Sequence, residues 1–215
     1  QTPNIKAFAE AGQLSSFTPE FPAVTCSAQS SYLTGQRVEA HGIVGNGWYD
    51  KTDSEVKFWK QSNALVGAEK IWEAAKKKDP NFTCAKMFWW YNMYSSADYS
   101  VTPRPQYHSD GVKAPDCYSH PADLRDELQA KLGTFPLINF WGPNANIKST
   151  NWIADASIYV DKKYDATLTF IYLPHLDYCL QKFGVDFEKI KSDLKEIDQV
   201  VERLITHFES KGAKV

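Results

Sequence analysis

Apolar runs that alternate with amphipathic segments predict an α/β fold, a mostly parallel sheet with helices on both faces. Residues 83–91 form a continuous apolar and aromatic run of strand length, which is typical of a strand covered on both faces. Residues 166–173 alternate β-forming and apolar side chains and end at Pro174. Residues 68–78 and 186–211 carry apolar side chains three and four positions apart, as helices packed on a sheet do.

Shorter signals predict the remaining elements. Capping and stop residues favour helices, and short apolar runs favour strands. Helices are expected at 3–11, 25–34, 121–133 and 151–159, strands at 12–17, 135–141 and 213–215, and loops at 48–57 and 92–120. The second loop is long enough to be a lid or a specificity loop over an active site.

The length of 215 residues allows one sizeable core or two small ones, and we expect a single domain over residues 1–215. The chain has 43% hydrophobic and 23% charged residues, which is ordinary for a soluble domain. A net charge of -2 argues against a nucleic acid or an anionic membrane surface as partner. The sequence shows no signal peptide and no apolar run of about 18 residues, so the compartment stays open and the cytoplasm is favoured.

The four cysteines, Cys26, Cys84, Cys117 and Cys179, form no C-x-x-C pair, so we expect free thiols. Cys26 is the thiol to suspect of reactivity, because a helix N-terminus activates a thiolate. A cysteine hydrolase that uses Cys26 with His41 is therefore one alternative, although no third orienting residue is apparent.

The candidate catalytic residues of the sequence lie around Thr25. An apolar run ends there, small polar residues able to form a helix follow, and Gly35 closes the segment. This strand-to-helix elbow would set the Thr25 hydroxyl beside the free amides of a helix N-terminus, where an anion is favoured. Taken alone, Thr25 would be interpreted as a helix cap, and Asn46, between two glycines, as a turn residue.

The residues from Phe21 to Asp50 carry a family resemblance. Phe-Pro-x-x-Thr at 21–25, Thr-Gly at 34–35 and His-Gly-Ile-Val-x-Asn-x-x-Tyr-Asp at 41–50 resemble the nucleophile region of the nucleotide pyrophosphatase/phosphodiesterase branch of the alkaline phosphatase superfamily. The resemblance implies that Thr25 is the nucleophile and a metal ligand. It also implies that Asn46, with the backbone amide of Cys26, holds phosphoryl oxygens.

A second motif follows the strand predicted at 166–173. The family has Asp-x-x-x-His here, an i, i+4 helical pair that binds one of two zinc ions. Asp177 fits the Asp, but Gln181 stands where the His would be. Because an amide oxygen is a weaker zinc ligand than imidazole, we expect this site to be altered, served instead by His175, or lost. By itself, Asp177 after Pro174 would be a helix N-cap.

Together these motifs imply a zinc-dependent hydrolase of phosphodiester, pyrophosphate or phosphate ester bonds, acting on a small substrate such as a nucleotide. The family's other ligands, an Asp after an N-terminal strand, an Asp-His pair and a distal His, are not visible here. We therefore expect an incomplete domain that needs a flanking or complementary polypeptide. The alternative is a non-catalytic anion-binding or scaffold protein derived from the same family.

Overall fold

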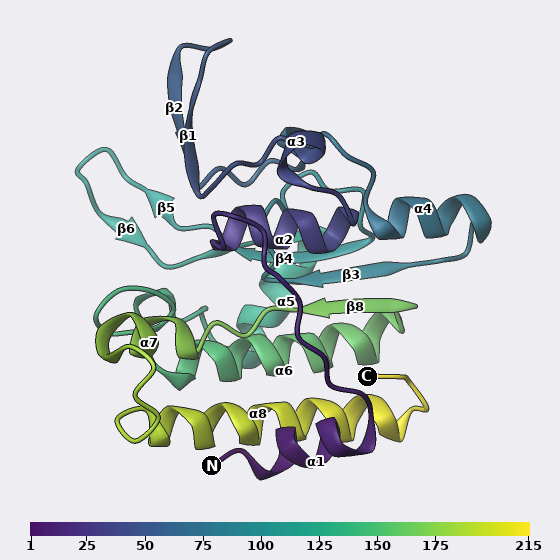
Figure 1. Cartoon of the computed structure of the whole chain (residues 1–215). Helices are drawn as coiled ribbons and strands as arrows, with labels where there is room; N and C mark the ends of the chain where they lie inside the picture. Colours follow the sequence, from purple (N-terminus) through teal and green to yellow (C-terminus); the bar gives the residue numbers. More distant parts are fainter.

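A four-stranded sheet with helices on both faces forms the centre of the computed structural model, which describes all residues from 1 to 215 (Figure 1). The strand order is β7-β4-β3-β8, in which β3 pairs in parallel with both β4 and β8, and β7 is antiparallel to β4. The strands are β3 (Cys84–Met87), β4 (Tyr99–Pro103), β7 (Cys117–His120) and β8 (Leu168–Ile171). The predicted α/β class with a mostly parallel sheet is thus confirmed.

Strand β3 is buried on both faces, as its continuous apolar run predicted. On one face Cys84 packs with Leu33 of α2 (Thr25–Thr34) and Trp72 of α4 (Ile71–Lys78). On the other face Ala85 and Met87 belong to the main core, to which α5 (Asp123–Leu132) and α6 (Ile147–Tyr164) contribute. Side chains alternate across a strand, so one short strand supports two helical layers.

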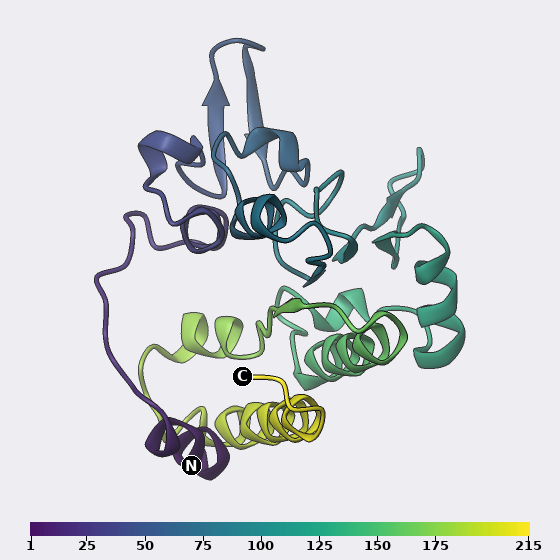
Figure 2. The same cartoon turned by 90° about the vertical axis from the view of Figure 1, so that its right-hand side faces the viewer.

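Helix α8 (Lys191–Ser210) lies outside α6, and α1 (Pro3–Ala11) lies against α8 (Figure 2). Ile197, Val200 and Leu204 of α8 pack on Ala154 of α6. The apolar stripe of α8 was expected to pack on the sheet. Ile171 of β8 does pack against it, but its main partner is α6. No helix here has the length and the apolar composition that crossing a lipid bilayer demands.

Residues 48–57 were predicted as a loop, but they lie in a hairpin of β1 (Gly47–Asp50) and β2 (Glu55–Phe58). The hairpin projects away from the sheet (Figure 1). Its polar turn residues dominate its composition, which explains the wrong prediction. Gly47 is needed at its base, because a Cβ there would lie 2.5 Å from the Phe58 ring.

The loop predicted at 92–120 is also corrected. It contains β4 and β7 of the central sheet, and only the hairpin of β5 (Gln106–Tyr107) and β6 (Lys113–Ala114) protrudes. Four of the five β4 residues are buried. The closely spaced prolines obscured these strands, since one proline ends β4 itself.

Three predicted strands are absent. Residues 12–17 have no strand partner and expose Leu14 and Phe17 by 82% and 68%. Residues 135–141 contain the 3-10 helix η2 (Leu137–Asn139), and residues 213–215 are irregular. None of the three short runs pairs with a strand of the central sheet. The remaining elements are α3 (Val38–His41), η1 (Asn63–Leu65) and α7 (Leu176–Phe183).

Candidate active site

Helix α2 begins at Thr25 and ends at Gly35, whose φ of 63° gives the left-handed cap that the sequence predicted. The preceding residues, however, form a bend and not a strand, so the first half of the expected elbow is corrected. The backbone amide of Cys26 donates to Asn46 Oδ1 at 2.9 Å. This amide was expected to face a phosphoryl oxygen, but in the structure Asn46 accepts its hydrogen bond.

Asn46 is held by the base of the β1–β2 hairpin. The backbone N–H of Trp59 donates to the Asn46 carbonyl at 3.0 Å, which closes the hairpin and brings Trp59 beside Asn46. Because Asn46 Oδ1 accepts from Cys26, the side-chain NH₂ group keeps two donors that this bond does not use. An amide oriented in this way can donate to a substrate oxygen near the start of α2.

Thr25 and Asp177 line the same cavity, which has a volume of about 360 Å³. Asp177 lies in the first turn of α7, directly after the carboxyl end of β8, which is where parallel sheets place ligand sites. Tyr172 also lines this cavity. Burial and the Asp177 charge raise the pKa of Tyr172 to about 12, and the neighbouring Thr25 side chain acts to lower it. The structure therefore gathers a hydroxyl, a phenol and a carboxylate at one site.

Aromatic side chains form most of the remaining wall of this cavity. Aromatic rings bind planar groups by stacking. Trp59 and Trp141 are 39% and 37% exposed, so parts of their rings are open to a ligand. The other lining residues are Gln61, Trp90, Pro103, Arg104, Pro105, Tyr107, Phe140, Pro174 and Tyr178. Arg104 comes from residues 92–120, the segment expected to lie over the active site, but it was not singled out from the sequence. Gln61 was given no role, because its segment shows no motif.

The segment after β3 reaches the cavity through backbone conformations that residues other than glycine rarely adopt. Phe88 and Tyr91 have φ values of 64° and 53°, which cost energy in residues with a Cβ. Buried polar groups hold this segment. Gln29 Oε1 accepts from the Trp90 N–H at 2.6 Å, and Asn63 Nδ2 donates to the Tyr91 carbonyl at 3.0 Å. The position of Trp90 in the cavity wall is thus fixed from α2 itself.

Cys26 does not have the properties of a nucleophile. The residue is fully buried, and burial raises the pKa of its thiol to about 12. His41 cannot serve as its base, because Nδ1 accepts from the Ile43 amide at 3.1 Å and Nε2 lies 3.0 Å from Ser31 Oγ. Burial also lowers the pKa of His41, which favours the neutral ring. The expectation of a Cys26–His41 pair is therefore corrected.

Asp177 and Gln181 lie one turn apart on α7, and Gln181 Nε2 donates to Asp177 Oδ2 at 3.0 Å. His175 does not join them. Its side chain is 1% exposed, and Nε2 lies 3.1 Å from Glu196 Oε2 on α8. The suggestion that His175 replaces the missing imidazole is wrong, because the ring points toward α8.

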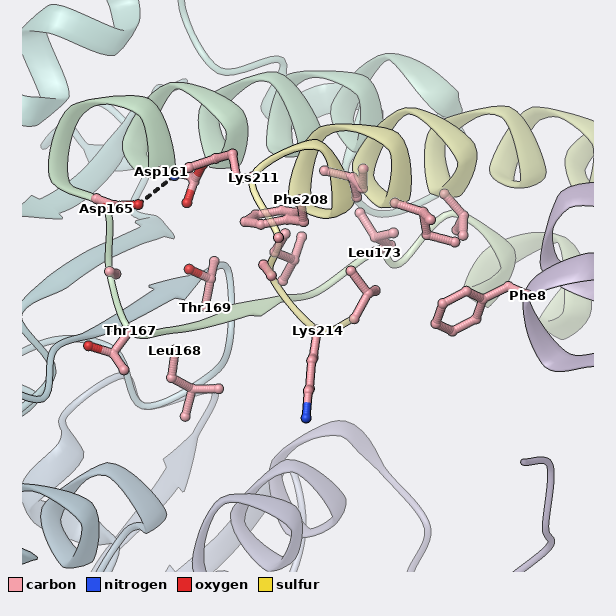
Figure 3. Close-up of a pocket in the computed structure, with 18 residues that line it drawn as sticks. Phe8, Asp161, Asp165, Thr167, Leu168, Thr169, Leu173, Phe208, Lys211 and Lys214 are labelled. Atoms are coloured by element: carbon pink, nitrogen blue, oxygen red, sulfur yellow. Dashed lines mark hydrogen bonds and ion pairs between the residues drawn. The ribbon is translucent and has the colours of Figure 1, made fainter. Parts of the chain in front are cut away.

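A different cavity, of about 480 Å³, lies between β8 and α8 (Figure 3). Phe8, Leu168, Leu173 and Phe208 give it a mainly apolar lining, with Lys211 and two aspartates at one end. It includes none of Thr25, Asn46 and Asp177. Thr25 and Asp177 line the other cavity instead, and Asn46 is absent from the lining of both, so this cavity is not the candidate active site.

Comparison with known proteins identifies one matching family. A family model described as type I phosphodiesterase/nucleotide pyrophosphatase matches residues 1–214. An uncharacterized pyrophosphatase/phosphodiesterase of Schizosaccharomyces pombe is 26% identical over 211 residues, which cover 95% of this chain and 36% of the yeast protein.

Solved structures agree on the fold. Phosphonoacetate hydrolase from Sinorhizobium meliloti 1021, in complex with phosphonoacetate, is 16% identical with a TM-score of 0.64 over 96% of this chain. Murine ectonucleotide pyrophosphatase/phosphodiesterase 5 is 16% identical with a TM-score of 0.59 over 98%. An inactive threonine-to-alanine variant of the mouse protein was solved with AMP. The chain covers 48% of each solved chain, so it spans about half the length of these structural relatives.

Proposed function

Because the chain belongs to the type I phosphodiesterase/nucleotide pyrophosphatase family, we propose that it supplies the nucleophile half of a metal-dependent phosphodiesterase or pyrophosphatase site. One observation carries the proposal: Thr25 and Asp177, far apart in sequence, line one aromatic cavity together with Tyr172. A small phosphate ester, such as a nucleotide, is the substrate that this cavity suits. The inactive threonine-to-alanine variant of the mouse relative supports a threonine nucleophile.

In the proposed reaction, Thr25 Oγ attacks phosphorus and loses its proton to solvent. The new P–Oγ bond forms as the bond to the leaving oxygen breaks, and that oxygen keeps the electron pair and takes up a proton. Water then attacks the phospho-threonine, the P–Oγ bond breaks, and the Thr25 hydroxyl is restored. Tyr172, with a pKa of about 12, stays protonated at neutral pH and acts as a hydrogen-bond donor.

Asn46 stabilises the charge that develops on the phosphoryl oxygens. Since the Cys26 amide fixes the carbonyl end of the Asn46 side chain, the NH₂ end is oriented before substrate binds. Donors that need no reorganisation are the ones that lower a reaction barrier most. Asn46 is thus proposed as a binding group for the transition state, and Cys26 acts through its backbone.

The residues of the cavity fit one side of a divalent-cation site. Asp177 is an exposed carboxylate with no Lys, Arg or His within 4.0 Å, and it shares the cavity with the Thr25 hydroxyl. We propose that Thr25 and Asp177, with Gln181 as a weak third ligand, hold zinc. A bound cation would favour ionisation of the Thr25 hydroxyl and offset phosphoryl charge. Further ligands of a two-zinc site are proposed to come from polypeptide outside these residues, flanking or complementary.

Hydrolysis of bis(p-nitrophenyl) phosphate in the presence of zinc tests the proposal. Thr25→Ala should reduce the rate at least about a thousandfold, because no attacking oxygen remains. Cys26→Ala should retain most activity, since the role of residue 26 is carried by its backbone amide. Thr52→Ala, in the exposed turn of the hairpin, is the matched control.

A Thr25→Ala protein that keeps most of the wild-type rate would contradict the threonine nucleophile. A wild-type protein that binds AMP but neither binds zinc nor hydrolyses the substrate would instead support the non-catalytic anion-binding alternative. Zinc equivalents bound per chain, measured by elemental analysis, separate the two functions.

A further inference from the structure

Arg104 is the arginine of this chain that has no acidic partner. The chain has four arginines. Arg37 lies 3.9 Å from Glu39, Arg125 lies 2.7 Å from Asp116, and Arg203 lies 2.8 Å from Asp155. Arg104 forms no ion pair within 4.0 Å and its side chain donates to no protein acceptor. A guanidinium left free beside a cavity can bind an anion without first breaking an internal ion pair.

The backbone presents Arg104 in a fixed position. The residue lies between Pro103 and Pro105, each of which restricts its own φ, and its N–H donates to the Asp116 carbonyl at 3.0 Å. The nearby carboxylate of Asp116 is already occupied, because it accepts from Arg125, Gln106 and Gln129. Burial acts to raise the pKa of Asp116, but these bonds hold it below its usual value. Asp116 therefore forms an ion pair with Arg125 and not with Arg104.

Arg104 lies at a border between two cavities. It lines the aromatic cavity that contains Thr25 and also a neighbouring cavity of about 570 Å³. Thr25 and Asp177 line only the first of these. A ligand that occupies both cavities can therefore place its phosphorus at Thr25 and another of its groups at Arg104.

The aromatic cavity contains one acidic side chain, Asp177, and one basic side chain, Arg104. We propose that Arg104 selects substrates that carry a second anionic group, beyond the scissile phosphorus and joined to it through a planar ring or sugar. This inference rests on the proposed function of Thr25. The exposed rings of Trp59 and Trp141 hold the planar part, and Arg104 binds the distant anion.

Two pairs of probes test this selectivity. The hydrolysis pair is thymidine 5′-(p-nitrophenyl phosphate) with and without a 3′-phosphate. The binding pair, thymidine 3′,5′-bisphosphate and thymidine 5′-monophosphate, needs no hydrolysis and is followed by tryptophan fluorescence. The wild-type protein should prefer the probe with the 3′-phosphate about tenfold to hundredfold in kcat/KM and in Kd. The preference should fall as salt is raised, because the Arg104 side chain is exposed.

Arg104→Ala should reduce both preferences to about onefold, and Arg104→Lys should keep part of them. Arg203→Ala, which removes a paired arginine on α8, should leave both unchanged. If the wild type binds with the expected preference but hydrolyses neither chromogenic probe, the proposed catalysis fails and the role of Arg104 stands. Equal Kd values for the two binding probes, binding of neither, or a preference that survives in Arg104→Ala would overturn the inference.

Discussion

Lys86 is a buried amine whose burial makes the stability of the fold depend on pH. Its side chain is fully buried, with Nζ 3.4 Å from the carbonyl oxygens of Trp90 and Tyr91 and 4.8 Å from the Trp72 ring. No carboxylate lies within 4.0 Å of it. Burial lowers the pKa of Lys86 from 10.5 to about 7. The amine therefore fixes two carbonyls beside the candidate site at the cost of desolvating a charge.

Replacing Lys86 with Met should raise the free energy of unfolding at pH 7 and remove a pH dependence. Between pH 7 and 10.5 the unfolded wild-type chain binds more protons at Lys86 than the folded one, so the Lys86 contribution to stability rises with pH. The slope is at most about 1.4 kcal/mol per pH unit. Denaturant unfolding of both proteins from pH 6 to 9 measures it.

The difference between the two proteins is the quantity to compare. The buried thiols of Cys26 and Cys117 have pKa values raised to about 12, so they lower stability at high pH, but equally in both proteins. The Lys86 charge acts to lower the pKa of the buried Cys84 thiol, so the two proteins are compared below pH 9, where that thiol is protonated in both. We expect the advantage of Lys86→Met to be full below pH 7 and to shrink toward pH 10.5. A difference that does not vary with pH would show that Lys86 stays charged in the folded state.

At the scale of elements, α1 is attached to the protein through a buried carboxylate. Asp198 of α8 is 2% exposed and accepts from the backbone N–H groups of Asn4 and Ile5 at 3.2 and 2.8 Å. These are first-turn amides that have no partner within α1. Helix α1 has no fully buried residue, so we expect the hydrogen bonds to Asp198 to be important for holding α1 against α8.

Asp198→Ala should loosen α1 while α8 and the sheet remain folded. A lost cap typically costs about 1 kcal/mol. Hydrogen exchange should therefore become faster in residues 3–11 than in β3 or α6. Glu202→Ala, on the exposed side of α8, serves as the control and should leave exchange unchanged. If α1 keeps its protection in Asp198→Ala, apolar contacts such as that of Phe8 hold it instead.

The second element-scale prediction concerns α7. Gln181→His should increase zinc affinity about tenfold to hundredfold, because imidazole is a better ligand than an amide and lies one turn from Asp177. Chelator competition gives the affinity, and Gln36→His, an exposed glutamine after α2, is the control. An unchanged affinity would mean that zinc, where bound, does not use residue 181.

Helices were more predictable than strands, for a physical reason. Amphipathic spacing in 191–210 and capping at Gly35 and Gly133 are local signals, and each of these helices is present. Strand pairing depends on partners elsewhere in the chain. The run at 135–141 is as apolar as β3, but Pro136 lacks a donor and η2 follows it. Apolar composition alone could not tell these two cases apart.

Across the whole molecule, the sequence could locate Thr25 and Asp177 but not the cavity around them. The two residues lie in motifs, whereas Trp59 follows a hairpin, Arg104 follows β4 and Trp141 follows η2. None of these segments has a periodic pattern that indicates proximity. These three residues line one cavity because of tertiary packing, which is seen only in the structure.

The assembly of this cavity from distant segments has a consequence for folding kinetics. Helices α6 and α8 consist of local contacts and form early, but the wall around Thr25 requires the β1–β2 hairpin, the turn after β4 and α7 to dock on one another. Contacts between remote segments form slowly, because loop closure costs entropy before the contacts repay it. After dilution from denaturant, far-UV circular dichroism should therefore recover in an earlier phase than the capacity to bind thymidine 3′,5′-bisphosphate. Stopped-flow measurement of both signals tests this order, and a binding signal that recovers together with the helical signal would mean that the cavity forms in the same step as the helices.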